Sequence, residues 1–300
     1  YQMTKIFEKN YETKVIYQKT AGRWLKHNLP AKPLITEEMD AIYALPFEYK
    51  AHPIYDGHKI PAYKQIKDSL TSHRGCYGGC NFCAIACHQG RSIQSRSENS
   101  LLKEAQKHKG TISDVGGPTA NMYASYCSLN FPDSCPRSSC LVPQICPNLR
   151  INHSLQLDVL EKITNLPNIK YVFIASGIRY DMAVNDDKYI ETIAIKYTGG
   201  RLKLAPEHSV PKVLRLMGKP NIDSFEKFCK KFYSFTKKAG LKRKIVPYLI
   251  IGHPGTTMED TYQLRNWLIR NKLVVEQVQE FTPTPMSIST CMFYTGLDYY

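Results

Sequence analysis

From residue 66 to the C-terminus, short apolar runs alternate with longer segments in which apolar residues recur at helical spacing. The short runs are rich in β-branched residues and predict strands at residues 66–71, 111–115, 170–175, 201–205, 244–251 and 274–281. The longer segments predict helices at residues 98–108, 155–165, 187–197, 225–239 and 258–271. Glycines follow three of these helices, at residues 110, 199 and 240, where a left-handed cap favours glycine.

Strands that alternate with helices predict parallel βαβ units with right-handed crossovers. The expected fold class is therefore α/β. A partial (β/α)6 TIM-like barrel is the simplest arrangement of six such strands. We expect this barrel to occupy residues 66–300, with a Cys-rich insert at about 124–150. Residues 1–65 contain five prolines and only short periodic stretches, so they predict an irregular lead-in packed on the core.

In barrels of this kind the working residues gather after the strands, at their carboxyl ends. The segments that follow the expected strands do carry unusual residues. They are 75–83, 116–118, 176–179, 206–208 and 252–255, which are rich in Gly, Cys, His and charged residues. This distribution predicts one functional edge of the sheet.

The composition narrows the class of protein. A chain of 300 residues that is 43% hydrophobic buries a sizeable core without disulfides. Its ten cysteines therefore predict chemistry in a reducing, cytoplasmic compartment. Since no apolar run approaches the roughly 18 residues of a membrane span, no membrane is expected. The chain begins at Tyr1 and stops at Tyr300 without a signal peptide, which predicts a fragment of a longer protein.

The net charge of +14 favours an anionic partner, such as nucleic acid or a phosphorylated cofactor. The densest basic stretch, residues 227–244, weakens this interpretation. Phe225, Phe228, Phe232 and Phe235 form an apolar stripe at helical spacing, and most of the lysines fall elsewhere on the helix. This arrangement is typical of a solvated outer face.

Cys76, Cys80 and Cys83 form a Cys-x3-Cys-x2-Cys loop among glycines. Thiolates this close together can surround a compact metal centre, and glycine allows the backbone to curl around it. An iron–sulfur cluster is the favoured occupant. Zinc, a redox pair of Cys80 and Cys83, and simple packing remain open from the spacing alone.

The loop and several other sequence motifs resemble those of the radical S-adenosylmethionine (SAM) superfamily, in particular its YgiQ-type members. These motifs are Arg74-Gly-Cys-Tyr-Gly-Gly-Cys-Asn-Phe-Cys, Ser113-Asp-Val-Gly-Gly-Pro, Ser176-Gly-Ile-Arg-Tyr-Asp and Cys291-Met-Phe-Tyr-Thr-Gly. The resemblance implies that Cys76, Cys80 and Cys83 bind three irons of a [4Fe–4S] cluster and that SAM binds the fourth iron. It also implies reductive cleavage of SAM to a 5′-deoxyadenosyl radical, which abstracts hydrogen from an unidentified substrate.

The same resemblance implies further SAM contacts. Phe82 is expected near the adenine, and Gly116 and Gly117 are expected to reach the SAM amino group through their backbone. Ser176 and Arg179 are expected to bind the ribose and the carboxylate, with Arg179 as a bidentate fork. Gly252 is expected to face the adenine. Glu207 and His208 are the candidate catalytic residues, and the alternative for the glycines is that they only form turns.

Four further cysteines, Cys127, Cys135, Cys140 and Cys146, lie within twenty residues of the proline-rich insert. Their spacing favours a second metal site, holding either an auxiliary iron–sulfur cluster or a structural zinc ion. Free buried thiols are the alternative. Cys87, Cys229 and Cys291 are interpreted as bystanders.

The leading hypothesis is a radical SAM enzyme that receives electrons from a donor such as flavodoxin or ferredoxin. A metal-stapled nucleic-acid-binding or RNA-modifying module is the alternative from the +14 charge and the cysteines. A one-electron carrier, which would need no SAM pocket, is a third. The sequence does not identify the substrate, and RNA remains among the candidates.

Overall fold

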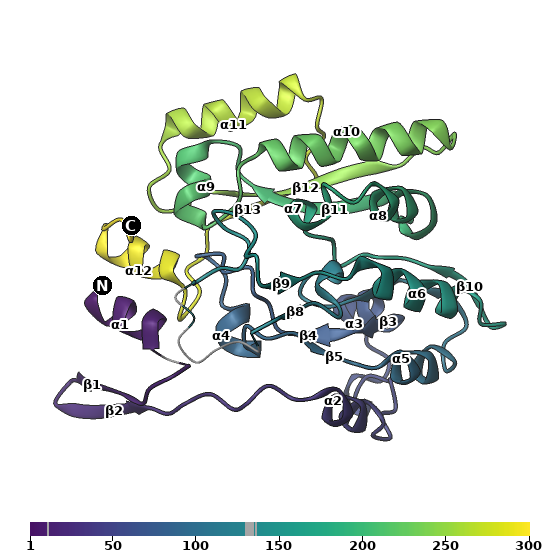
Figure 1. Cartoon of the computed structure of the whole chain (residues 1–300), viewed down its shortest axis with the longest axis horizontal. Coiled ribbons are helices and arrows are strands. Elements are labelled where there is room, and N and C mark those ends of the chain that lie inside the picture. Colours follow the sequence, from purple (N-terminus) through teal and green to yellow (C-terminus); the bar gives the residue numbers. More distant parts are fainter. Residues whose placement is uncertain (11, 130–134, 136) are drawn as a thin grey trace.

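The computed structural model describes residues 1–10, 12–129, 135 and 137–300, and it is a mixed α/β structure. The predicted strands pair in parallel, as expected (Figure 1). β3 (Ser69–Thr71) pairs with β7 (Asp114–Gly116), and β6 (Gly110–Ile112) pairs with β10 (Ile169–Val172). β11 (Arg201–Glu207), β12 (Lys244–Ile251) and β13 (Gln277–Glu280) form a three-stranded sheet.

The strand expected at 111–115 is divided at Ser113, which separates β6 from β7. Both parts nevertheless hydrogen-bond to the segment that follows β10. Phe173 donates its backbone N–H to the carbonyl of Ile112 at 3.0 Å, and Val115 donates to the carbonyl of Phe173 at 3.1 Å. β3, β7, β6 and β10 are therefore linked in one hydrogen-bonded group.

The predicted helices are present and cover one face of these strands (Figure 1). They are α5 (Glu98–Ala105), α6 (His153–Thr164), α8 (Asp187–Thr192) with a π-helical continuation η3 (Ile193–Tyr197), α10 (Asp223–Lys238) and α11 (Met258–Arg270). The main core forms where alternate strand residues, such as Leu202 and Leu204, meet these helices. Their neighbours Arg201 and Lys203 point to the opposite face.

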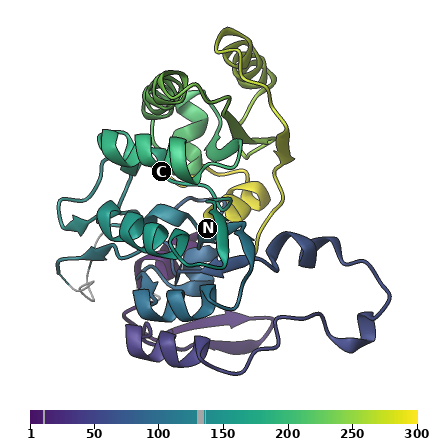
Figure 2. The same ribbon diagram turned by 90° about the vertical axis from the view of Figure 1, so that its right-hand side faces the viewer.

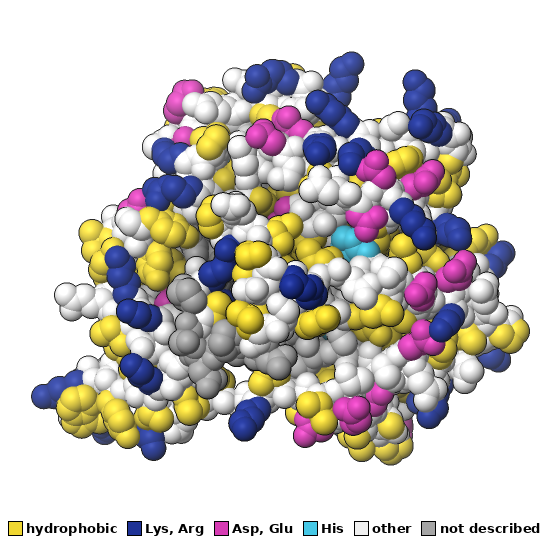
Figure 3. Space-filling view, viewed as in Figure 1, with side chains coloured by type: hydrophobic (Ala, Val, Ile, Leu, Met, Phe, Trp, Pro, Cys, Tyr) yellow, Lys and Arg dark blue, Asp and Glu magenta, His cyan; other side chains and the backbone are white. Residues whose placement is uncertain are grey.

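Helix α10 confirms the interpretation of its basic stretch. Phe225, Phe228 and Phe232 are buried in the core, whereas Lys237 and Lys238 are exposed. Figure 3 shows Lys and Arg side chains spread over this face of the molecule and interspersed with acidic ones. The charge of this helix therefore solvates the outside of the fold.

The first 68 residues contain short elements that the sequence pattern did not predict. They are α1 (Gln2–Asn10), an antiparallel hairpin of β1 (Ile16–Thr20) and β2 (Arg23–His27), α2 (Thr36–Tyr43), η1 (Pro53–Tyr55) and α3 (Pro61–Ile66). In both ribbon views this purple segment lies at the opposite edge of the molecule from α10 and α11 (Figure 2). Trp24 and Leu25 of the hairpin are exposed, whereas Ile16 is buried.

The remaining short elements connect the strands. They are β4 (His73–Arg74) with its antiparallel partner β5 (Gln94–Ser95), α4 (Ile85–Gln89), η2 (Ala120–Met122), α7 (Tyr180–Ala183), α9 (Pro211–Met217) and α12 (Ile288–Thr295). β8 (Tyr126–Cys127) pairs with β9 (Leu149–Arg150), and this antiparallel pair closes the base of the Cys-rich insert. Residues 130–134 and 136 of the insert lie outside the described residues.

Candidate functional site

The cysteine loop, residues 75–83, lies directly after β4. Its first residue, Gly75, has φ +90°, and a Cβ there would lie 2.0 Å from the carbonyl oxygen of Ser92. Only glycine fits this backbone conformation and this contact. The loop can therefore turn sharply away from the strand and present its cysteines at the edge.

Two sulfurs of the loop and the guanidinium of Arg179 lie close to Gly78. A Cβ on Gly78 would lie 3.3 Å from Cys76 Sγ and 3.9 Å from Cys80 Sγ. Each sulfur also accepts an N–H group: Gly78 donates to Cys76 at 3.4 Å, Ile85 donates to Cys83 at 3.4 Å, and Arg179 Nη1 donates to Cys80 at 3.5 Å. Donors to sulfur stabilise thiolate, which is the form that binds metal.

As free thiols, Cys76 and Cys83 favour the protonated form. Burial, reinforced by the charges of Cys80 and Cys76 and opposed by the N–H of Ile85, raises the pKa of Cys83 to about 11. Burial and the charge of Cys80 also raise the pKa of Cys76. A bound cationic centre would remove this penalty, so the sulfur donor set fits an iron–sulfur cluster.

Arg179 lies beside the cysteine loop, and its guanidinium is almost fully buried. Its Nε and Nη2 donate to the two carboxylate oxygens of Asp181 at 2.8 and 2.6 Å. The resemblance predicted that Arg179 would bind a ligand carboxylate as a bidentate fork. In this structure the fork binds Asp181 instead. The remaining nitrogen, Nη1, faces Cys80. Arg179 therefore places a fixed positive charge next to a sulfur.

Gly116 and Gly117, at the end of β7, have no room for a side chain. A Cβ on Gly116 would lie 2.0 Å from Ser176 Oγ, and one on Gly117 would lie 2.7 Å from the ring of His73. The hydroxyl of Ser176 donates to Asp114 Oδ1 at 3.1 Å, so it is held at this strand end. Both glycines keep the loop after β7 close to its neighbours, and backbone groups are all that they can offer a ligand.

Glu207 ends β11 in a strained conformation, with φ +69°, directly after an irregularity in the pairing with β12. It is buried, and burial raises the pKa of its carboxyl group, while the positive charges of Lys219 and Arg179 oppose the shift. Lys219 is itself buried and donates to the carbonyl of Ala205 at 2.6 Å. Strained backbone conformations, such as that of Glu207, are concentrated at functional sites.

His208 follows Glu207 and is fully buried. Its Nδ1 accepts the backbone N–H of Val210 at 3.1 Å, and its Nε2 has no hydrogen-bond partner among the described residues. Burial lowers the pKa of His208 to about 4, so the ring is neutral at pH 7. A neutral ring with a free nitrogen is a candidate for binding a ligand hydroxyl.

Phe82 and the loop that contains Gly252 lie next to each other. The ring of Phe82 meets the ring of His253 edge-on at 6.4 Å and packs against an apolar cluster that includes Ile250 and Phe281. Gly252 has φ +69°, and a Cβ there would meet no atom within 4 Å. The predicted residues Phe82 and Gly252 are thus brought together from opposite ends of the sequence.

The Cys-rich insert supports the cysteine loop, a contact that the sequence did not predict. Ser139 Oγ donates to the carbonyl of Gly78 at 2.7 Å, and Cys140 donates its backbone N–H to the carbonyl of Tyr77 at 3.1 Å. Gly79 has φ +62°, and a Cβ there would lie 2.5 Å from the carbonyl oxygen of Ser138. The glycines of the loop were the only available signal of this close approach.

Two of the insert cysteines lie in an apolar environment, which Cys76 of the loop also contacts. Cys140 is buried in a small apolar cluster with Tyr77 and Leu141, and Cys146 packs against that cluster. Burial raises the pKa of Cys140 to about 11; Arg91 opposes the shift, and the other three insert thiols add to it. Within the part of the chain that the structure describes, no three Cys, His, Asp or Glu side chains are already grouped as ligands of one metal ion, and this applies to the cysteine loop as well as to the insert.

Two residues that the sequence reasoning missed fix this edge of the sheet. Asn81 donates its backbone N–H to Met217 and its Nδ2 to the carbonyl of Leu216, both at 2.9 Å. Asp181 holds Arg179, as described above. The Arg-x-Asp spacing was visible in the sequence, but nothing in the pattern indicated that both groups would be buried.

Comparison with known families assigns the chain. Residues 70–268 match the model of the Radical SAM superfamily, and residues 1–69 match the model described as Radical SAM N-terminal. The chain belongs to the radical SAM superfamily.

Among curated proteins it is 48% identical over 280 residues to a UPF0313 protein of Methanocella arvoryzae, covering 91% of this chain and 47% of the relative. It is 44% identical over 291 residues to the UPF0313 protein YgiQ of Escherichia coli, covering 94% and 39%.

The resemblance to YgiQ-type radical SAM proteins is therefore confirmed. The chain spans less than half the length of these relatives.

Among solved structures the chain is similar to the radical SAM methyltransferase TsrM of Kitasatospora setae, with TM-score 0.47 and 11% identity, covering 74% of this chain and 38% of the other. Methylornithine synthase (PylB) gives TM-score 0.43 and 13% identity, covering 86% and 68%. These likenesses are too distant to carry a functional inference. None of the described helices is long and apolar enough to cross a membrane.

Proposed function

We propose that this chain is the catalytic core of a radical SAM enzyme and that Cys76, Cys80 and Cys83 hold its [4Fe–4S] cluster. The observation that carries the proposal is that each of the three sulfurs of this glycine-rich loop accepts an N–H group, from Gly78, Arg179 or Ile85. Three protein sulfurs leave one iron of such a cluster open. When bound, the cluster and SAM supply a 5′-deoxyadenosyl radical that abstracts hydrogen from the substrate.

We propose that the parallel strands together form a partial (β/α)6 barrel. The parallel pairs and the helices on one face support this architecture. In it, the cysteine loop, Gly116–Gly117, Ser176 and Glu207 would lie at one end, because each follows or ends a parallel strand. Residues 1–65 would be a lead-in packed on this core.

In this proposal the residues around the loop bind and orient SAM. Gly116, Gly117 and Gly252 offer backbone groups, and Phe82 packs against the adenine. Ser176 positions Asp114, and both groups face the ribose. Arg179 acts on the cysteine loop through Cys80, and it can approach the SAM carboxylate only with the nitrogen that now faces the sulfur.

Glu207 and His208 are proposed to contact the substrate or the ribose. Burial raises the pKa of Glu207, which favours its protonated form, and the neutral ring of His208 has Nε2 without a hydrogen-bond partner among the described residues. Neither group is needed to hold the cluster. Their substitution is expected to impair turnover while iron content is kept.

For the insert we propose a second metal site formed by Cys127, Cys135, Cys140 and Cys146, holding an iron–sulfur cluster or zinc. The electrostatic influence of the other three thiols on Cys140 supports it, since it requires them to lie near one another. We further propose a one-electron donor such as flavodoxin or ferredoxin as partner. The substrate stays open, with RNA among the candidates.

Anaerobic reconstitution with iron and sulfide tests the central proposal. We expect a [4Fe–4S] spectrum in the wild-type chain and 5′-deoxyadenosine when the reduced protein is incubated with SAM. A cluster that forms without any SAM cleavage would indicate the one-electron carrier instead. Absence of a cluster, or an unchanged cluster in Cys80→Ala, would contradict the proposal.

A further inference from the structure

The β1–β2 hairpin presents one of its faces to solvent. In its antiparallel register Tyr17 lies opposite Lys26, and Lys19 lies opposite Trp24. Residues that are opposite each other, or two apart on one strand, share a face of the hairpin. Tyr17 and Trp24 are 59% and 68% exposed, and both lysines are exposed as well. This outer face therefore alternates aromatic rings with positive charges.

The base of the opposite face attaches the hairpin to α1. Ile16 is buried, and its partner in the register, His27, meets the ring of Phe7 edge-on at 5.5 Å. His27 Nε2 and Gln18 Oε1 are hydrogen-bonded at 3.2 Å. Because the hairpin is fixed from this side, its outer face points away from the protein.

The four side chains of the outer face are not engaged with the rest of the described chain. Tyr17 and Trp24 contact no other aromatic ring in it. Lys19 and Lys26 pair with none of its carboxylates. Both the rings and the charges are thus available to a partner.

The sequence around the hairpin carries charge of one sign. Between Glu12 and Glu37 it contains no Asp or Glu. The basic residues of that stretch are Lys14, Lys19, Arg23, Lys26 and Lys32. Figure 3 shows hydrophobic and basic side chains at the corner that β1 and β2 occupy in Figure 1, with no acidic side chain visible among them. The outer face is therefore complementary to an anionic partner.

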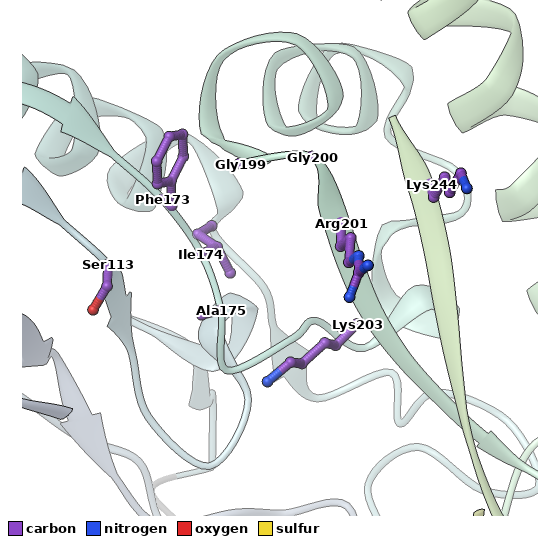
Figure 4. A pocket seen from close by; sticks show the side chains of 9 residues that line it. All are labelled: Ser113, Phe173, Ile174, Ala175, Gly199, Gly200, Arg201, Lys203 and Lys244. Atoms are coloured by element: carbon purple, nitrogen blue, oxygen red, sulfur yellow. The ribbon is translucent and has the colours of Figure 1, made fainter. Parts of the chain in front are cut away.

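A second group of basic residues shows the contrast. Arg201, Lys203 and Lys244 line a cavity between the segment that follows β10 and strand β11. Figure 4 shows Lys203 and Lys244 pointing apart. Arg201 is paired with Glu276 at 2.6 Å, and the carboxylate of Asp114 interacts electrostatically with Lys203. Positive charge is therefore dispersed and partly neutralised there, whereas on the hairpin it is not.

Exposed rings interleaved with lysines fit single-stranded RNA. Unpaired bases stack on aromatic side chains, and the backbone phosphates bind Lys and Arg. Tyr17 and Trp24 are diagonal neighbours across the two strands, about 7–8 Å apart. Two bases of one strand can stack on them while Lys19 and Lys26 contact the phosphates. RNA is favoured over DNA because its loops and ends present unpaired bases. A membrane surface fits less well, because a lysine lies opposite each ring and divides the apolar area.

Helix α1 connects the hairpin to the cysteine loop. Glu8 of α1 lines the same small hollow, of about 40 Å³, as Cys80 and Cys83. Arg91 also lines this hollow and is paired with Glu12, just before the hairpin, at 3.5 Å. A strand bound to the hairpin is therefore held on the side of the molecule that carries the loop.

From these observations we propose that the outer face of the β1–β2 hairpin binds single-stranded RNA. Tyr17 and Trp24 stack on its bases, and Lys19 and Lys26 bind its phosphates. The role of this RNA as a recruited substrate rests on the proposed function, but its binding does not.

Fluorescence anisotropy of a labelled RNA of about 12 nucleotides tests the surface. The RNA contains only A and C, so that it cannot pair with itself. We expect Trp24→Ala in the full chain to weaken binding about tenfold, because a stacked base loses its ring. The matched control is Tyr262→Ala, which removes a ring that is 55% exposed on α11. It should change the affinity less than about twofold, and circular dichroism verifies that both variants are folded.

The salt dependence of binding tests the two lysines. Lys19→Gln/Lys26→Gln is compared with Lys237→Gln/Lys238→Gln, which removes the same charge from the exposed face of α10. We expect the first pair to reduce the slope of log affinity against log salt by about 1.4, or about 0.7 for each phosphate contact. The second pair should leave the slope unchanged. Equal slopes in the two pairs would contradict the assignment of phosphate contacts to the hairpin.

Tryptophan fluorescence reports the stacking directly. The chain has two tryptophans, and the other one, Trp267, is buried in the core. RNA should therefore quench the exposed Trp24. Trp24→Phe keeps an aromatic ring, so we expect it to bind RNA within about threefold of wild type but to lose the quenching. Full quenching in Trp24→Phe would place the RNA elsewhere and overturn the proposal.

The same anisotropy titration on Cys80→Ala separates this inference from the proposed function. RNA binding that persists in this variant supports the hairpin surface, even if the wild-type chain yields no 5′-deoxyadenosine. No binding to the wild-type chain, or equal weakening by Trp24→Ala and Tyr262→Ala, overturns it. Two further arms use a single-stranded DNA of the same sequence and phosphatidylserine vesicles. Tighter binding of the DNA, or binding of the vesicles without binding of RNA, would also show the proposal to be wrong.

Discussion

The cysteine loop and the Cys-rich insert are equally rich in cysteine but differ in what surrounds each sulfur. In the loop, each of the three sulfurs accepts an N–H group. In the insert, Cys140 and Cys146 pack in an apolar cluster that Cys76 of the loop also contacts, and the insert binds the loop through its backbone. The difference teaches that donors to sulfur, rather than the number of cysteines, favour the loop as the site of the proposed cluster.

The largest expected effect is on iron. Cys80→Ala removes one of the three proposed ligands, so we expect reconstituted iron at the loop to fall from about four per chain to near zero. Cys140→Ala is expected to leave the loop cluster in place, since it keeps the backbone N–H that binds Tyr77. Iron and zinc counts with electron paramagnetic resonance measure both. Loss of the loop cluster in Cys140→Ala would remove the distinction between the two regions.

The two regions also differ in how metal changes thiol reactivity. Alkylation requires thiolate, and the pKa of both Cys83 and Cys140 is raised to about 11 by burial. In the metal-free chain both should therefore react about 100-fold more slowly at pH 8 than an ordinary thiol, with rates that rise about tenfold per pH unit up to pH 11. Mass spectrometry of iodoacetamide-treated protein measures each site.

After reconstitution, Cys83 is expected to become unreactive at every pH. Cys140 will be protected as well only if the insert also holds metal. Continued alkylation of Cys83 in the reconstituted protein would count against the loop as the cluster site.

A smaller effect is expected where the two regions touch. Gly79→Ala adds a Cβ 2.5 Å from the carbonyl oxygen of Ser138, in a backbone conformation with φ +62°. We expect a loss of about 2 kcal/mol in unfolding free energy and a several-fold lower cluster occupancy. Gly22→Ala is the matched control, since Gly22 has φ +76° and an added Cβ meets no atom within 4 Å.

Chemical denaturation and iron content measure both variants. Equal effects of the two substitutions would show that backbone strain alone, and not the contact with the insert, lowers the unfolding free energy and the cluster occupancy.

The smallest effect concerns redox tuning. Arg179→Met removes the N–H donor and positive charge beside Cys80, so we expect the midpoint potential of the cluster to shift negative by tens of millivolts, on the order known for hydrogen bonds to cluster sulfurs. Arg150→Met, in the exposed base of the insert, is the control and should leave the potential unchanged. Spectroelectrochemical titration gives both values. An unchanged potential in Arg179→Met would mean that the hydrogen bond to Cys80 has no role in tuning.

The sequence predicted the parallel strands and the helices that cover them because burial of one face imposes a regular pattern. It missed the β1–β2 hairpin because Trp24 and Leu25 are exposed, so no apolar alternation distinguishes that segment. Strand ends moved by up to three residues, as for β13, which begins at Gln277 rather than 274. Pairing at strand ends depends on neighbours that the local sequence does not contain.

The candidate site was predictable only where its residues are contiguous. The spacing of Cys76, Cys80 and Cys83 predicted the cysteine loop. The hydrogen bonds from the Ser139 hydroxyl and the Cys140 backbone to that loop join groups about 60 residues apart. Such contacts leave no periodic signal. The burial of the Arg179–Asp181 pair is likewise a property of the folded chain.

The anchoring of Asn81 has a consequence for the order in which the protein becomes functional. Three segments made after the loop hold its backbone: Cys140 binds Tyr77, Met217 accepts the N–H of Asn81, and Ser289 donates to the carbonyl of Asn81 at 2.8 Å. During synthesis the cysteines emerge long before residue 289 does. Such long-range contacts form late in folding. A growing chain therefore exposes three thiols before the contacts that hold their loop have formed, and the proposed cluster would be loaded after the fold is complete.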